Sequence, residues 1–255
     1  FPYTTLFRSL IIIPARSGSK RIQNKNMKIF VSKPLLGHKI ISCLKSGVGR
    51  VLVSTDSKKI AEYSKKKGAE VPFLRPKKFS TSKASTISCV LHALRFLKEK
   101  GDKLPRYVAV LPATNPFLKI SSIKNAYKNL KKSNKFNSIL GYTHSREHPF
   151  HYININKGLK FDILKFKKSK YSDYERTQDW PKAYVASAAL KISKTLYFLK
   201  YINNSSSTLN KKTFDMKSCK GHLITNIESF DINNNNDFII GKSIFNNLKT
   251  VLQKY

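Results

Sequence analysis

Cysteine and long apolar runs are scarce in this chain of 255 residues. The three cysteines lie far apart and have no spacing typical of metal ligands. Cys43 and Cys89 fall in apolar patterns typical of helices, so we expect buried free thiols and a reduced, cytoplasmic setting. No run approaches the roughly 20 apolar residues that span a bilayer, which predicts no contact with a membrane.

An initiator methionine is also missing, since the sequence begins with Phe1. A signal peptide needs a longer apolar stretch than Leu10–Ile13 provides. We interpret residues 1–9 as an extension foreign to the fold and residues 10–255 as one domain. A domain of this length can bury a substantial core.

Acidic residues are few, 14 against 49 Lys and Arg, and the net charge is +35. A nucleic-acid-binding protein would gather such charge on one face. The lysines here are spread along the whole chain, and asparagine is abundant with them, which suggests an AT-rich coding sequence. We therefore expect no nucleic-acid partner and a field that attracts anionic substrates. A basic binding protein without catalysis stays an alternative.

The first loop fits neither common phosphate-binding motif, GxxxxGK[ST] or GxGxxG. Residues 11–26 read IIIPARSGSKRIQNKN, an apolar strand followed by small and cationic residues. Small residues let backbone N–H groups approach an anion, and the cations neutralise its charge. Parallel sheets bind ligands just beyond such strands, so the segment predicts a phosphate site.

Strand and helix patterns alternate along the first half of the chain, which predicts an α/β fold with a mostly parallel sheet. Strands are expected at 10–13, 50–54, 70–74, 107–111, 137–143, 184–192 and 222–226. Helices are expected at 35–45, 58–67, 85–100, 121–130 and 237–252. A hairpin of 150–156 and 159–164 indicates a small antiparallel insertion at about 145–180. Such an insertion often covers an active site or forms a dimer contact.

Seven motifs occur in order: IPARSGSKRIQNKN, VSTD, LRP, STISCVLHAL, LPATNPF, RTQDWPKAY and FDINNNNDF. Together they resemble the acylneuraminate cytidylyltransferase family, from about Leu10 to the C-terminus. The resemblance implies the Rossmann-like, three-layer fold of nucleotide-diphosphosugar transferases and a homodimer. It also implies CMP transfer from CTP to the anomeric hydroxyl of a 2-keto-3-deoxy sugar acid, with Mg²⁺ and release of pyrophosphate. Another NTP or sugar on the same fold stays an alternative.

The predicted nucleotide site is centred on the first loop. Arg16, Lys20 and Lys25 are suited to hold a triphosphate, because Arg binds phosphate bidentately and Lys acts as a point charge. The resemblance makes Lys25 the strongest catalytic candidate, together with Arg16 and Arg176. The residues that it places at the nucleotide are Arg16, Ser19, Lys20, Lys25, Asn26, Arg75, Ser85 and Thr86. Taken alone, Ser85 and Thr86 would be read as a helix start.

The resemblance also implies where the sugar acid and the metal bind. The residues implied for the sugar acid are Thr114, Asn115, Arg176, Gln178 and Tyr184. The chain departs from the family's usual residues at Pro112, Thr177 and 186–189, which suggests a different nonulosonate or a related keto-sugar acid. Asp231 is the expected Mg²⁺ ligand, with Asn233 in place of a second carboxylate. We expect Asp237 to cap the last helix and Asp56 to be a positioning group.

Overall fold

A six-stranded sheet forms the middle layer of the computed structural model, which describes residues 9–82, 84–149, 153–155, 161–163, 176, 178, 180–202 and 218–252. Its strands, in spatial order, are β10 (Cys219–Leu223), β6 (Ser138–His144), β9 (Tyr184–Lys194), β5 (Tyr107–Val110), β1 (Ser9–Pro14) and β4 (Arg50–Ser54). β1 runs parallel to β4 and β5, and β10 runs parallel to β6. Only β9 is antiparallel to both of its neighbours. The predicted mostly parallel sheet is confirmed.

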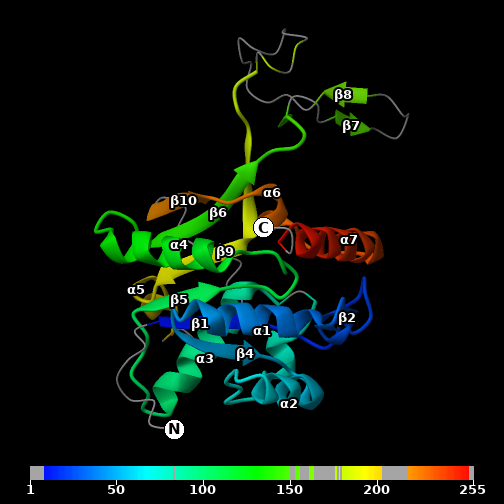
Figure 1. The fold of residues 1–255 in the computed structure, drawn as a ribbon. Coiled ribbons are helices and arrows are strands. Elements are labelled where there is room, and N and C mark those ends of the chain that lie inside the picture. The colour runs from blue at the N-terminus through cyan, green and yellow to red at the C-terminus, as the bar shows by residue number, and fades with distance from the viewer. Residues whose placement is uncertain are drawn as a thin grey trace.

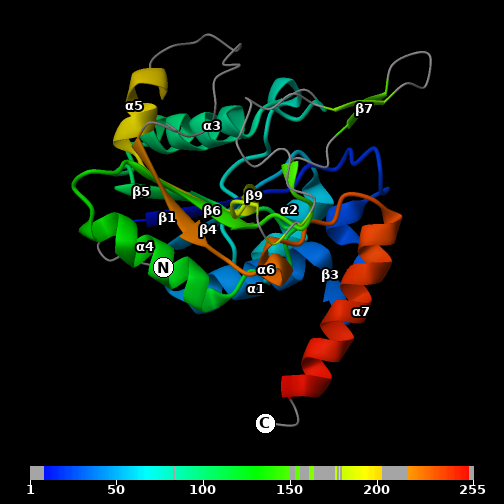
Figure 2. The same ribbon diagram turned by 90° about the horizontal axis from the view of Figure 1, so that it is seen from above.

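Helices cover both faces of this sheet (Figures 1 and 2). On one face lie α1 (Leu35–Ser46) and α4 (Ile120–Lys132), and on the other lie α3 (Thr86–Glu99) and α5 (Leu196–Ile202). The remaining helices are α2 (Lys58–Lys66), α6 (Asn226–Ser229), α7 (Asn235–Leu252) and the 3₁₀ turns η1 (Lys25–Met27) and η2 (Lys77–Phe79). The short β2 (Ile29–Phe30) and β3 (Lys33–Pro34) form a hairpin before α1. The three-layer α/β architecture therefore follows the prediction.

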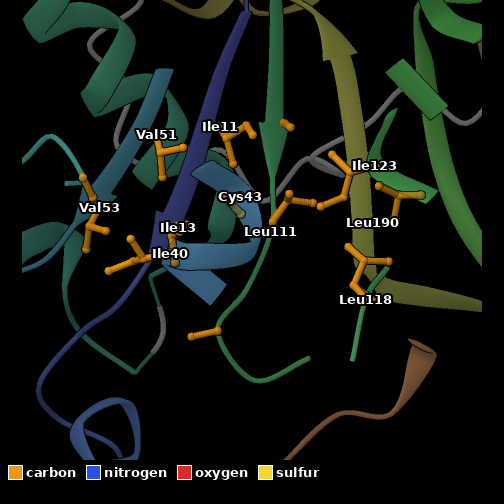
Figure 3. Close-up of a cluster of buried hydrophobic side chains, with 14 of the residues drawn as sticks. Ile11, Ile13, Ile40, Cys43, Val51, Val53, Leu111, Leu118, Ile123 and Leu190 are labelled. Atoms are coloured by element: carbon orange, nitrogen blue, oxygen red, sulfur yellow. The ribbon is translucent and has the colours of Figure 1, made fainter. Parts of the chain in front are cut away.

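β1 is buried on both sides, as its continuous apolar sequence requires. Ile11 and Ile13 pack with α1 and α4, whereas Leu10 and Ile12 pack with α3. Figure 3 shows the first cluster, in which Ile11 and Ile13 lie near Ile40 and Cys43. Burying one such side chain contributes about 1.5–3 kcal/mol, so β1 is anchored strongly at the position where the first loop leaves it.

Local sequence signals set the ends of the helices. α1 ends at Gly47, whose φ of 62° is the left-handed conformation that glycine adopts without strain. α3 begins after Ser85, whose hydroxyl accepts a hydrogen bond from the Ser88 N–H. The predicted positions of α1, α2, α3, α4 and α7 agree with the structure within two residues. β1 begins at Ser9, one residue before the expected start.

The strand predicted at 70–74 is wrong. Glu70 makes one isolated bridge to Leu52, and the segment then leaves the sheet. Pro72 has no N–H to donate, so it cannot continue a ladder.

The predictions at 222–226 and at Asp237 also need correction. β10 ends at Leu223, because Thr225 and Glu228 form a capping box that begins α6. Asp237 is not the N-terminal cap of α7. Asn234 accepts a hydrogen bond from the Asp237 N–H, while the Asp237 carboxylate accepts from the Asn233 and Asn234 N–H groups.

A small third core lies beside the sheet and joins the first loop to the C-terminal segment. Ile22 of the loop packs with Phe30, Leu35, Ile232 and Phe238. Because Ile232 and Phe238 flank the start of α7, this core fixes the segment that carries Asp231 against the first loop.

Most of the predicted insertion lies outside the described residues. Its described strands, β7 (Ile153–Ile155) and β8 (Phe161–Ile163), pair antiparallel as predicted. Figure 1 draws this hairpin beyond the end of the sheet, past the projecting ends of β6 and β9. In the part of the chain that the structure describes, no helix has the length and apolar character needed to cross a membrane.

Candidate active site at the carboxyl edge of the sheet

The first loop leaves β1 at the edge where the parallel strands end, and Asp56 fixes its beginning. The Asp56 carboxylate accepts hydrogen bonds from the Ser17 N–H at 2.8 Å and from the Ser17 hydroxyl at 3.0 Å. The Ala15 N–H donates to the Ser54 carbonyl at the end of β4. Asp56 therefore positions the loop, as expected. Ser19 and the exposed Lys20 follow within the same loop.

Asn26 closes the loop from its other end. Its side-chain amide is buried and donates to the Arg16 carbonyl at 3.0 Å. This bond brings the two ends of the loop together, so Asn26 has a clear structural role. Its predicted contact with the nucleotide stays a prediction.

Lys25 reaches from η1 to the segment before α7. Its Nζ donates to the Ile232 carbonyl at 2.8 Å and lies near the Asp231 carboxylate. Burial lowers the pKa of Lys25, the Asp231 charge opposes this, and Arg21 and Arg16 add to it. The structure thus brings together the predicted catalytic lysine and the predicted metal ligand, which are far apart in the sequence.

Asp231 presents one oxygen without a partner. Its Oδ2 accepts a hydrogen bond from Asn233 Nδ2 at 3.1 Å. Its Oδ1 is buried and has no hydrogen-bond partner among the described residues. A buried carboxylate oxygen without a partner is costly, so a ligand at this position would be stabilised.

Lys191 on β9 is a second cation that interacts electrostatically with Asp231. Burial lowers its pKa, and the Asp231 carboxylate opposes this. Sequence reasoning missed Lys191. The available signal was a lysine between the buried Leu190 and Ile192.

The loop after β5 holds the Asp231 segment in place. The Ile232 N–H donates to the Thr114 carbonyl at 2.9 Å, and Asn115 Nδ2 donates to the Phe230 carbonyl at 3.0 Å. Asn115 is 0% exposed. The predicted sugar-acid residues Thr114 and Asn115 are thus near the site, and both hold its scaffold.

Arg75 is a buried cation at the neighbouring strand end. It is 6% exposed, and its Nε and Nη2 have no hydrogen-bond partner within the described ranges. The backbone N–H of Arg75 donates a hydrogen bond to the Thr55 carbonyl at 2.7 Å, and Thr55 directly follows β4. Burial and the Arg75 charge both lower the pKa of His92. An unsatisfied buried guanidinium favours an anionic or carbonyl ligand.

Ser85 and Thr86 begin α3. The Ser85 hydroxyl accepts from the Ser88 N–H at 3.3 Å, which is the helix-cap arrangement. A role of either residue at the nucleotide stays a prediction.

A cationic cavity of about 530 Å³ lies between the first loop and the start of α2. Its charged lining residues are Arg16, Arg21, Lys28 and Lys59. Its volume falls in the range of about 300–1,000 Å³ that is typical of small-molecule sites. The positive electrostatic field of these four side chains favours the binding of phosphate groups in the cavity.

The other predicted sugar-acid residues lie towards the projecting part of the chain. With its amide oxygen facing Arg176, Gln178 accepts hydrogen bonds from Arg176 Nε at 2.9 Å and from Nη2. Tyr184 is 50% exposed and packs against Tyr142 with ring centroids 5.4 Å apart. The register of β9 against β6 shifts between these residues, with Lys191 opposite Leu140 and Tyr184 opposite His144. At about 3.3 Å per residue, these four positions of β6 correspond to roughly 13 Å along the sheet. Tyr184 therefore lies towards the end of β9 that is remote from Lys191.

Comparisons with known proteins identify the family of this chain. The model of the family described as Cytidylyltransferase matches residues 10–244. A pseudaminic acid cytidylyltransferase of Campylobacter jejuni is 35% identical over 182 residues, covering 69% of this chain and 74% of the relative. A CMP-N,N'-diacetyllegionaminic acid synthase of Legionella pneumophila is 38% identical over 129 residues, covering 50% of this chain and 55% of the relative.

A solved structure supports the fold. The structure of CMP:2-keto-3-deoxy-manno-octonic acid synthetase complexed with CTP has a TM-score of 0.66 and 14% identity to this chain. The match covers 94% of this chain and 98% of the other. At this identity the likeness shows the fold alone.

Proposed function

The chain belongs to the cytidylyltransferase family, and from this premise we propose that it transfers CMP from CTP to the anomeric hydroxyl of a nonulosonate, releasing pyrophosphate. The relatives named above act on sugar acids of this class, as their names state. A basic protein without catalysis would have no use for the Lys25–Asp231 arrangement. That arrangement is the observation that carries the proposal.

Lys25 is the residue that we assign to the reacting phosphate. The sugar hydroxyl attacks the α-phosphorus of a triphosphate carrying about four negative charges, and pyrophosphate leaves. Charge stabilisation and positioning supply most of the catalysis in such a transfer. The contact of Lys25 with the Ile232 carbonyl holds its ammonium in place before substrate binds. Arg16, Ser19 and Lys20 would hold the remaining phosphates.

Arg75, which is held by the Thr55 carbonyl just after β4, supports a nucleotide site at this edge of the sheet. Its two buried nitrogens without a partner are available to oxygen atoms of the nucleotide. A guanidinium can bind such oxygens bidentately. Ser85 and Thr86, at the nearby helix start, complete the proposed nucleotide site together with Asn26.

Asp231 fits Mg²⁺ through its unpartnered Oδ1. Mg²⁺ at a triphosphate commonly takes only one or two protein carboxylates, with phosphates and water as the other ligands. When bound, Mg²⁺ would neutralise charge on the phosphate oxygens. We therefore propose Asp231 as the Mg²⁺ ligand, with Asn233 positioning its carboxylate.

A homodimer would complete the sugar-acid site. Arg176, Gln178 and Tyr184 are the groups suited to the acceptor's carboxylate and hydroxyls. Tyr184 lies roughly 13 Å along the sheet from Lys191, and in the proposed dimer these groups would serve the partner's reaction centre. The hairpin of β7 and β8 is the proposed dimer element. The free thiols Cys43 and Cys89 support a reduced, cytoplasmic setting.

Pyrophosphate release tests the reaction. The four NTPs are each combined with pseudaminate, diacetyllegionaminate, N-acetylneuraminate and 2-keto-3-deoxy-octonate. We expect release with CTP and at least one nonulosonate, and far less with ATP, GTP or UTP. Release no higher than buffer with CTP and every nonulosonate would exclude the proposed reaction. Salt-sensitive nucleic-acid binding without turnover would then favour the binding protein.

Mixing two inactive variants tests the homodimer. Lys25→Met removes the proposed catalytic ammonium, and Tyr184→Ala removes a proposed acceptor contact. If Tyr184 serves the partner's centre, mixed dimers contain one intact site and regain activity. No recovery from a mixture shown by mass to contain mixed dimers would contradict this assignment.

A further inference from the structure

The cationic cavity between the first loop and α2 is not explained by the proposed nucleotide site. Of the residues proposed to hold CTP, the cavity is lined by Arg16 and Asn26 alone among the described residues. Its other cations are Arg21, Lys28 and Lys59. Lys25 does not line it, since the Lys25 ammonium donates to the Ile232 carbonyl. The cavity is therefore distinct from the proposed reaction centre.

The four cations around the cavity are not balanced by carboxylates in its wall. None of the described residues that line it is acidic. The two carboxylates that lie closest to the lining residues in the sequence accept hydrogen bonds elsewhere. Asp56 accepts two from Ser17, and Asp237 accepts from the Asn233 and Asn234 N–H groups. Because like charges that share one cavity repel each other, a bound anion would stabilise this arrangement.

The first turn of α2 adds hydrogen-bond donors to the cations. Ser57, Lys59 and Ile60 line the cavity, and this turn contains no acidic residue. The first N–H groups of a helix have no partner inside it and carry the positive end of the helix dipole. The Ser57 hydroxyl accepts from the Ile60 N–H at 3.4 Å, so the preceding N–H groups of α2 are the donors suited to a ligand.

Part of the cavity wall is fixed by the scaffold. The Lys28 ammonium lies 5.0 Å from the centre of the Phe238 ring, which holds this charge in place. Asn26 donates to the Arg16 carbonyl at 3.0 Å, and Ile22 belongs to the small third core beside the sheet. Groups that are held before a ligand arrives lose less conformational entropy when it binds. This fixed wall distinguishes the cavity from the lysines spread over the rest of the chain.

We propose that this cavity is a second phosphate site, which binds an inorganic oligophosphate such as pyrophosphate. Four cationic side chains favour a ligand with several negative charges over a monoanion. Since Arg16 belongs to both sites, pyrophosphate in the cavity weakens the binding of CTP, and this coupling is reciprocal. Pyrophosphate as the natural ligand rests on the proposed function, which releases it. The existence of the site does not.

Equilibrium dialysis with radiolabelled pyrophosphate tests the site. The sugar acid is left out so that no turnover occurs, and binding is measured with and without saturating CTP. We expect the protein saturated with CTP to bind one further pyrophosphate per chain. Lys59→Met and Lys28→Met should each weaken this binding about fivefold or more, the scale for losing one contact between unit charges in water.

Lys58→Met is the matched control. Lys58 is the exposed neighbour of Lys59 in the first turn of α2, but it lines a different groove together with Glu62 and Leu74. The Lys58→Met protein should bind pyrophosphate as the wild type does. The affinity of Lys59→Met for CTP should stay within twofold of wild type.

Three results would overturn the inference. The first is equal affinity of Lys59→Met and wild type for pyrophosphate. The second is complete loss of pyrophosphate binding when CTP is added. The third is an equal loss of CTP and pyrophosphate affinity in Lys59→Met, which would make the cavity part of the nucleotide site. A protein that binds no CTP would reject the proposed function, while the comparison of Lys59→Met with Lys58→Met in the absence of CTP would still test the cavity.

Discussion

Replacing Lys39 by methionine should stabilise the protein. Lys39 lies on α1, is 1% exposed, and its Nζ has no hydrogen-bond partner within the described chain. Burial lowers its pKa from 10.5 to about 8, and Cys43 one turn later opposes this slightly. The protein thus buries an ammonium that is still charged at pH 7, which is energetically unfavourable.

The pKa shift sets the size and the pH dependence of the effect. The difference between 10.5 and about 8 corresponds to about 3 kcal/mol at about 1.4 kcal/mol per unit. Below pH 8 Lys39 is charged in both the folded and the unfolded state, so the full cost is present. Between pH 8 and 10.5 the unfolded state binds more protons, so the stability of the wild type rises with pH. Lys39→Met should therefore raise the free energy of unfolding by about 3 kcal/mol at pH 7 and by progressively less towards pH 10.5.

Urea unfolding at pH 7 and at pH 10 measures this difference. Lys45→Met is the control, since Lys45 is exposed in the last turn of the same helix. Its loss should change stability by less than about 1 kcal/mol, and in the unfavourable direction, because lysine suits a helix C-terminus. A Lys39→Met protein that is no more stable than wild type at pH 7 would refute the reasoning. An equal gain at both pH values would refute the electrostatic cause.

Three further changes test the site and its scaffold. Lys25→Met should lower turnover about 10²-fold or more in the pyrophosphate assay, the scale for losing a charge aimed at the transition state; turnover within twofold of wild type would remove the catalytic assignment. Gly49→Ala should lower the melting temperature, because its Cβ would lie 2.3 Å from the Ser9 carbonyl oxygen, and an unchanged melting curve would contradict this contact. Burial raises the pKa of Glu228, but hydrogen bonds from Ser122 and neighbouring groups outweigh it and leave the pKa lowered. The resulting contribution to the free energy of unfolding is present above the unfolded pKa and is lost as pH falls through the folded pKa. Glu228→Gln should therefore have a lower melting temperature than wild type at pH 7. On acidification to pH 4 its melting temperature should fall by less than that of wild type.

Local patterns predicted the scaffold of the site well. Three features of the scaffold depend only on short segments of sequence. These are the alternation of Leu10 to Ile13 between two cores, the end of α1 at Gly47 and the start of α3 after Ser85. Such signals survive folding because they depend on neighbouring residues in the sequence. The strand predicted at 70–74 was wrong because the prediction relied on the apolar residues of the segment. Pro72 has no N–H to donate to a neighbouring strand, and this decides the structure.

Contacts between distant segments were harder to predict. Family resemblance identified Lys25 and Asp231, but only the fold shows that they lie together. The residues next to Asn115 in the sequence do not indicate whether its side chain holds the scaffold or binds the sugar acid. Lys191 was missed for the same reason, since the Asp231 carboxylate that acts on its pKa lies 40 positions away in the sequence.

The Asp231 segment is held chiefly by hydrogen bonds of its main-chain atoms. The Asp231 carboxylate is therefore available to a ligand and is not needed to hold the segment in place. Lys25 and Asn115 donate to the carbonyls of Ile232 and Phe230, and the Ile232 N–H donates to the Thr114 carbonyl. None of these bonds uses the Asp231 carboxylate, whose Oδ1 has no hydrogen-bond partner among the described residues. Asp231→Asn should therefore leave the melting temperature close to that of wild type while it weakens the dependence of activity on Mg²⁺. A variant that unfolds, or whose Mg²⁺ titration curve is unchanged, would mean that the carboxylate supports the scaffold rather than the metal.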